Sequence, residues 1–190
     1  MTEDEEDEMR SGHRYRADSE DPEPEPPGSR ESLPTSCVPK LTRPGYSCIP
    51  SIEDMAQMSK AELSRVDNLE IRREGFGWVR FEGLTDVRYM DFDTLLCIES
   101  RELIMYPLGN IPPLGKGLNK KAVVNLIASP TAKLLKSRSH SDIVAVVKEV
   151  TESLGGKFLS YDMKNWLFRM ERFDTTGKRG SPAKTLPSPT

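Results

Sequence analysis

The first 36 residues are too acidic and too rich in proline to form a hydrophobic core. They hold 12 Asp and Glu against 4 Lys and Arg, a net charge of −8, together with five of the chain's 15 prolines. They contain no Val, Ile, Phe or Trp. Ordering them would therefore not bury enough apolar surface to offset a backbone entropy cost of roughly 1–2 kcal/mol per residue. We predict a disordered acidic arm over residues 1–36.

Residues 37–173 are expected to form one domain, and residues 174–190 a flexible tail rich in Ser, Pro and Lys. The domain segment holds 20 bases and 17 acids (+3), and the tail 3 bases and 1 acid (+2), so that −8, +3 and +2 give the chain's net charge of −3. About 140 residues are enough for one sizeable core. A charge of +3 is too small to make nucleic acid the expected partner.

Membrane-spanning and secreted proteins are disfavoured by the same sequence. The longest run without a charge, Leu103 to Gly115, is 13 residues long and contains three prolines, which is too short for a transmembrane helix. The chain opens with acids instead of a basic and apolar leader, so we see no secretory signal. Cys37, Cys48 and Cys97 are an odd number without metal-type spacing, which favours reduced thiols in a cytosolic or nuclear protein.

The apolar pattern predicts a mixed fold of strands and helices. A helix is expected to begin at Ser51, and a longer one to span Ile143 to Leu154, where apolar residues recur every three or four positions. Alternating or β-rich runs predict strands, with a Gly/Pro loop over Pro107–Leu118. The expected strands are Leu69–Arg72, Trp78–Phe81, Leu95–Ile98, Leu103–Tyr106, Val123–Ile127, Phe158–Tyr161 and Trp166–Met170. We therefore predict an α+β domain of antiparallel, sandwich-like β-sheets flanked by helices.

Signals for an enzyme are sparse. The only histidines are His13, in the acidic arm, and His140, which we interpret as a surface residue at the start of the second helix. No zinc-type spacing or nucleophile elbow is present. Gly115-Lys116-Gly117 lacks the full phosphate-binding pattern and leads into a strand, so we interpret it as a structural loop.

The segment Glu74–Phe81 resembles the octapeptide of RNA-recognition domains, in which aromatic side chains stack on bases. It gives an alternative function, an RNA-binding module whose Gly75–Phe81 octapeptide contacts RNA through Phe76, Trp78 and Phe81. Glu74 replaces the cation of that motif, and prolines interrupt the upstream segment in which a companion strand is expected. Core or sheet-face residues are therefore the simpler interpretation of the three aromatics.

Six motifs, in order from about Leu41 to Phe173, resemble those of one known family. They are P-G-Y-S-C-I-P-S-I-E-D-M-A from Pro44, R-R-E-G-F-G-W-V-R-F-E-G from Arg72, R-E-L-I-M-Y from Arg101, P-P-L-G-K-G-L-N-K-K-A from Pro112, G-K-F-L-S-Y-D from Gly156, and W-L-F-R-M from Trp166. The family is the nucleoporin autopeptidase domain, the C-terminal domain of GLFG-repeat nucleoporins. The stretch Thr85–Arg88 favours a plant-type, stand-alone member. The resemblance implies a compact domain of β-sheets flanked by helices, docked on the nuclear pore scaffold.

The resemblance also locates a cleavage position and a departure from it. Family members that cut themselves carry His-Phe followed by Ser or Thr, with the hydroxyl as nucleophile and the histidine as base. This chain has Arg172-Phe173-Asp174 there. A guanidinium stays protonated near neutral pH, and a carboxylate offers no hydroxyl for the ester intermediate. We expect no efficient self-cleavage.

The function that follows is a non-catalytic docking domain of the nuclear pore complex. We expect it to be a structural or accessory component in nucleocytoplasmic transport, including protein import and mRNA export. The expected partners are scaffold nucleoporins, with only weak RNA binding, and the expected location is the nuclear pore and envelope, otherwise nucleus or cytoplasm. We expect no cofactor, metal ion, small-molecule substrate or membrane insertion. Phe-Gly repeats are absent, and the acidic arm stands in the place where relatives carry them.

Overall fold

A computed structural model describes residues 37–173 of the chain. The predicted acidic arm and C-terminal tail, with His13 and Asp174, lie outside the described residues, and the domain boundaries remain predictions. The helices are α1 (Ile52–Gln57), α2 (Lys60–Leu63), α3 (Phe92–Leu95), α4 (Ala132–Ser137) and α5 (His140–Ser153). The strands are β1 (Tyr46–Ile49), β2 (Val66–Asp67), β3 (Glu70–Arg73), β4 (Gly77–Phe81), β5 (Leu84–Thr85), β6 (Leu96–Glu99), β7 (Glu102–Met105), β8 (Ala122–Ile127), β9 (Lys157–Tyr161) and β10 (Asn165–Met170).

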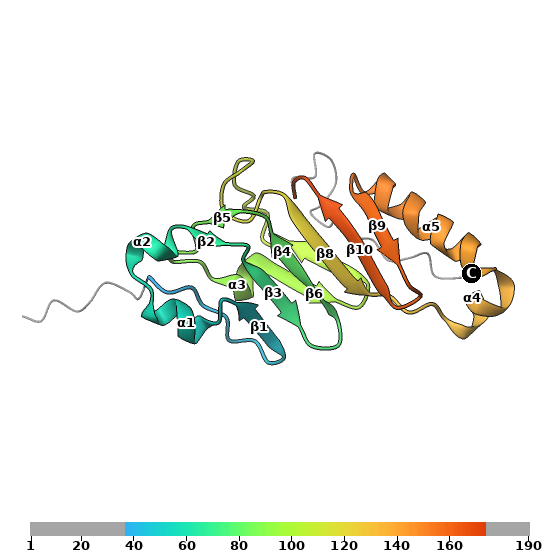
Figure 1. The fold of residues 1–190 in the computed structure, drawn as a ribbon, viewed down its shortest axis with the longest axis horizontal. Helices are drawn as coiled ribbons and strands as arrows, with labels where there is room; N and C mark the ends of the chain where they lie inside the picture. The colour runs from blue at the N-terminus through green and yellow to red at the C-terminus, as the bar shows by residue number, and fades with distance from the viewer. Residues whose placement is uncertain (1–36, 174–190) are drawn as a thin grey trace, which may run out of the picture. The chain divides into compact units, whose positions relative to one another are not determined.

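Six of the strands form one sheet in the order β1-β3-β4-β8-β10-β9, and every neighbouring pair is antiparallel (Figure 1). Two short antiparallel pairs, the β6–β7 hairpin and the β2–β5 pair, complete the strand content of the described residues. The α+β class and the antiparallel pairing that the sequence predicts are confirmed.

Each central strand alternates between a buried and a less buried face, as a half-covered sheet requires. Helix α5 packs on the buried face through Ile143, Val147 and Thr151. There the indole N–H of Trp166 donates a 2.8 Å hydrogen bond to the Thr151 hydroxyl, which in turn donates to the Val147 carbonyl. This chain of bonds satisfies the polar groups that α5 buries against β10.

The β6–β7 hairpin lies on the same buried side, beneath the other end of the sheet. The guanidinium of Arg73 donates a 2.6 Å hydrogen bond to the Ile98 carbonyl, and the Ile98 amide donates to the Tyr46 hydroxyl. Figure 1 shows β6 on one side only of β3, β4 and β8. The opposite face of β3, β4, β8 and β10 is therefore the one open to solvent within the described residues.

Local sequence accounts for the elements that were predicted. The helix expected at Ser51 is α1, where Ser51 and Asp54 exchange the two hydrogen bonds of a capping box. The longer helix is α5, capped in the same way by Ser139 and followed by Gly155 at φ 75°.

Contrary to the sequence-based expectation, a strand forms upstream of the octapeptide despite the prolines there, but it is not a neighbour of the octapeptide strand β4, because β3 lies between them. Strand β1 forms between Pro44 and Pro50 and pairs with β3 from Tyr46 to Ile49. The prolines flank the strand, so none of its ladder amides is lost.

Candidate functional site

Phe173, the last described residue, is held in the core immediately after β10. Its side chain is 3% exposed and meets Phe81 of β4 edge to face, with the ring centroids 6.1 Å apart. Its backbone N–H donates a 2.8 Å hydrogen bond to Oδ1 of Asn119. Phe173 is therefore fixed by both its ring and its amide.

Asn119 directly follows the predicted Gly/Pro loop, Pro107–Leu118, in the segment between β7 and β8. Its side chain is almost fully buried, and its Nδ2 donates to the Pro112 carbonyl over 2.8 Å. Nearby, the Leu118 amide donates to the hydroxyl of Tyr106, whose burial raises its pKa to about 12. The loop, which includes Gly115-Lys116-Gly117, is thus joined by hydrogen bonds to Tyr106 and, through Asn119, to Phe173.

Arg172 is exposed beside a hollow of about 520 Å³. Glu82, Leu114, Lys121 and Glu171 also line this hollow. Of the predicted triplet, the structure thus describes an exposed Arg172 and a buried Phe173.

The octapeptide forms the β3–β4 turn and the whole of β4. Gly77 is indispensable there, since a Cβ at this position would lie 2.1 Å from the Asn125 carbonyl oxygen and the residue has φ +142°. The absence of a side chain lets β4 approach β8 closely.

The three aromatics of the octapeptide do not share a surface. Phe81 is fully buried against Phe173, which corrects the expectation that its ring contacts RNA. Phe76 precedes β4, and the Arg73 guanidinium lies 3.9 Å from the centroid of its ring. Only Trp78 stands on the open face of the sheet, so a platform of three stacked bases has no counterpart in this structure.

A buried carboxylate organises the cations around Trp78. Glu70 is 2% exposed, and it accepts hydrogen bonds from Arg72 on Oε1 and from Arg80 on Oε2, the latter at 2.9 and 2.6 Å. The Arg80 guanidinium also lies 5.2 Å from the Trp78 ring centroid. A buried carboxylate needs such partners, and by holding them it fixes two otherwise flexible side chains.

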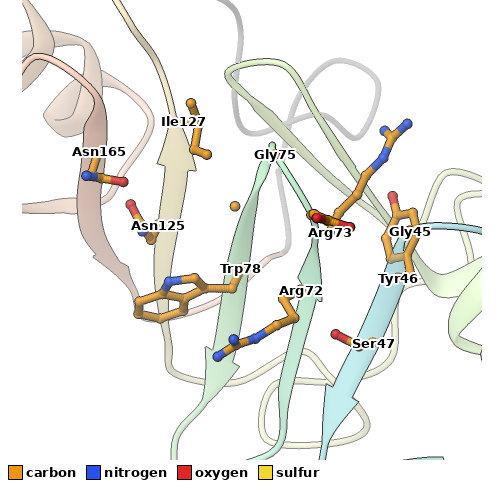
Figure 2. A pocket seen from close by; sticks show the side chains of 12 residues that line it. Gly45, Tyr46, Ser47, Arg72, Arg73, Gly75, Trp78, Asn125, Ile127 and Asn165 are labelled. Atoms are coloured by element: carbon orange, nitrogen blue, oxygen red, sulfur yellow. The ribbon is translucent and has the colours of Figure 1, made fainter.

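A shallow cup of about 480 Å³ opens at the turn end of this face. Figure 2 shows the Trp78 ring beside Asn125 of β8, with Asn165 of β10 nearby and Arg72 on the other side of the indole. Oδ1 of Asn125 has no hydrogen-bond partner among the described residues.

Other sequence-based candidates are separated in the fold. Cys37, Cys48 and Cys97 are all unpaired, as expected, and burial raises the pKa of the Cys48 thiol to about 11. His140 opens α5 and is exposed. Within residues 37–173, no three His, Cys, Asp or Glu side chains gather in a way that could hold a metal ion. None of the helices in this range is both long enough and apolar enough to cross a membrane.

Comparison with known proteins identifies the family. The family model described as Nup98-96 autopeptidase S59 matches residues 43–177. The chain belongs to the nucleoporin autopeptidase family. The match confirms the resemblance carried by the six motifs, and it ends four residues after Phe173.

Two nuclear pore complex proteins illustrate the relationship to the family. Nup98-Nup96 of Dictyostelium discoideum is 32% identical over 150 residues, which cover 72% of this chain and 7% of that protein. NUP96 of Arabidopsis thaliana is 32% identical over 155 residues, which cover 78% of this chain and 15% of that protein. The chain therefore spans a small part of the length of these relatives.

Solved structures of autopeptidase domains share the fold. The autopeptidase domain of Chaetomium thermophilum Nup145N, a T994A mutant fused to a Nup145C segment, superposes with a TM-score of 0.61 at 27% identity, covering 70% of this chain and 96% of that one. A chain of the yeast Nup82-Nup159-Nup116 complex gives a TM-score of 0.59 at 21% identity, covering 69% and 98%.

Proposed function

We propose that this chain is a non-catalytic docking domain of the nuclear pore complex, and that it contributes to nucleocytoplasmic transport, including protein import and mRNA export. The observation that supports it most directly is the family match over residues 43–177 combined with the altered triplet at Phe173. Phe173 and its Asn119 contact remain, whereas the base and the hydroxyl are replaced. A domain that stays folded but does not cleave itself can still act by binding partner proteins at its surface.

Intact-mass analysis of the full chain tests the catalytic half of the proposal. We expect one species of 21.4 kDa after prolonged incubation. A matched variant, Arg172→His with Asp174→Ser, restores the triplet of the self-cutting relatives and should yield a species that ends at Phe173. A clean cut after Phe173 in the unaltered chain would refute the proposal that the domain is non-catalytic.

Affinity capture tests the docking half. The full chain is immobilised and exposed to a nuclear-envelope extract, with a Val124→Asp variant, whose fully buried core position now carries a charge, as the unfolded control. We expect scaffold nucleoporins in the first eluate and not in the second. The support for this partner class is that the fold neighbour in the yeast heterotrimer belongs to a nucleoporin complex. Recovery of no pore subunit would count against docking.

A further inference from the structure

The open sheet face carries an ordered row of side chains that the packing of the domain does not use. Pairing of the strands places Arg72 opposite Trp78, Trp78 opposite Asn125, and Asn125 opposite Leu167. Ser47 extends the row at the β1 side, opposite Arg72. Trp78 and Leu167 are partly exposed, so the middle of the row offers apolar surface between polar groups.

Glu70 holds the two arginines of this face, Arg72 and Arg80, in place. The carboxylate of Glu70 is almost completely buried and both of its oxygens are already occupied, so it presents no acceptor to a ligand. Arg72 and Arg80 are 46% and 49% exposed, and each uses two of its donor nitrogens, Nε and Nη2, on Glu70. A guanidinium has five N–H donors, so about three remain on each arginine. Carboxylates are the groups that such donors recognise most strongly in a protein ligand.

The groups beside the indole favour a peptide over a nucleic acid. Asn125 and Asn165 place neutral amides beside the indole. Oδ1 of Asn125 is buried and lacks a partner among the described residues, and Nδ2 of Asn165 already donates to Oδ2 of Asp162, so each amide keeps at least one further hydrogen-bonding group for a peptide backbone. Tyr46 and Trp78 both line the cup and are partly exposed, but the Tyr46 hydroxyl contacts Ile98 on the buried side of the sheet, so of the two only Trp78 lies on the open face. Glu74 lies exposed at the rim of the cup. One stacking platform beside a carboxylate is a poor match for a phosphate backbone.

We propose that this face binds an extended segment of a partner protein in which acidic side chains flank an apolar residue. The apolar residue packs on Trp78, the carboxylates take the unused donors of Arg72 and Arg80, and the asparagine amides meet the peptide backbone. Tryptophan and arginine are the side chains that most often dominate binding at protein interfaces. This inference rests on the proposed docking function, because its ligand is a segment of a protein partner.

The two tryptophans of the chain give a direct test by NMR. The full chain, labelled with nitrogen-15, is titrated with a short synthetic peptide in which glutamates flank a central Pro-Leu pair. We expect the indole N–H signal of Trp78 to shift, and that of Trp166 to stay in place because it is buried and bonded to Thr151. A stationary Trp78 signal, or equal binding of the same peptide with lysines for glutamates, would overturn the proposal. Equal binding of an oligouridine of the same length would also overturn it.

Substitutions separate this surface from the docking function as a whole. Fluorescence polarisation with the glutamate peptide should show affinity at least tenfold weaker for Trp78→Ala, and clearly weaker for Arg72→Lys with Arg80→Lys, which keeps the charges but loses the planar fork. Arg138→Lys, an exposed cation on another element, is the matched control and should bind as the unaltered chain does. An unchanged Trp166 indole signal verifies that each variant is folded. If the unaltered chain captures pore subunits but its Trp78 face does not bind the peptide, this inference is wrong and the proposed docking function is still supported. If it binds the peptide but captures no pore subunit, the proposed function fails instead.

Discussion

Replacing Phe173 by alanine should destabilise the domain although Phe173 is the last described residue. Its ring is 3% exposed, and truncation of a buried phenylalanine to alanine costs about 3–5 kcal/mol. The edge-to-face contact with Phe81 accounts for about 1 kcal/mol of that cost. Because Phe173 follows the last strand and does not lie within it, we expect the lower limit, about 3 kcal/mol.

Urea unfolding followed by tryptophan fluorescence measures this effect. In a separate thermal melt, a loss of about 3 kcal/mol in the free energy of unfolding should lower the midpoint temperature by about 10 °C for a domain of this size. Phe173→Leu, which fills most of the space, should cost about 1 kcal/mol. A double-mutant cycle with Phe81→Leu isolates the contact between the rings, and we expect a coupling free energy of about 0.5–1.5 kcal/mol. If Phe173→Ala changes the free energy of unfolding by less than about 0.5 kcal/mol, the ring is not part of the core and the reasoning is wrong.

Three further changes test other parts of the structure. Asn119→Ala removes two hydrogen bonds from a buried site and should cost about 2–4 kcal/mol in urea unfolding; a neutral effect would mean that water replaces the amide. Gly77→Ala should prevent native folding or cost more than about 3 kcal/mol, because its Cβ would meet the Asn125 carbonyl. Gly75→Ala has open space around it and should cost only about 1 kcal/mol of backbone strain. Thermal melts followed by circular dichroism measure both effects. The pKa of Tyr106 is raised to about 12 by burial, so the folded state holds its proton more tightly than the unfolded state; its contribution is complete below pH 10 and is lost as the pH rises to 12. Tyr106→Phe should therefore make the fall in stability over that window shallower, and an unchanged slope would contradict the shift.

The long periodic segments could be predicted from the sequence because their burial pattern is set locally. Helix α5 and strands β8 and β10 each repeat apolar residues at the spacing of their own geometry. The short elements could not be predicted in this way. Helices α2 and α4 span four and six residues, which is too few for a period to show, and they depend on caps and on the packing around them.

The site was less predictable because its contacts join distant parts of the chain. Alternation along β3 suggests that Glu70 and Arg72 share a solvated face, and they do share a face. Glu70 is nevertheless buried, since Arg80 from the next strand closes over it, and no local pattern reveals that closure. The pairing of Phe81 with Phe173 likewise depends on the order of the strands, so the octapeptide alone is consistent with a core position for Phe81 but does not identify its partner.

The altered triplet separates two constraints that fall on adjacent residues. Phe173 is buried and contributes to the stability of the fold, so stability alone is sufficient to retain it. Arg172 is exposed, and substitutions at exposed positions usually change stability by no more than about 0.5 kcal/mol, so stability does not require a histidine there. Once cleavage is no longer needed, the base and the nucleophile are free to change while the phenylalanine stays. Under the proposed non-catalytic function, a phenylalanine that stays beside an exposed position that changes is therefore what the stability of the fold predicts.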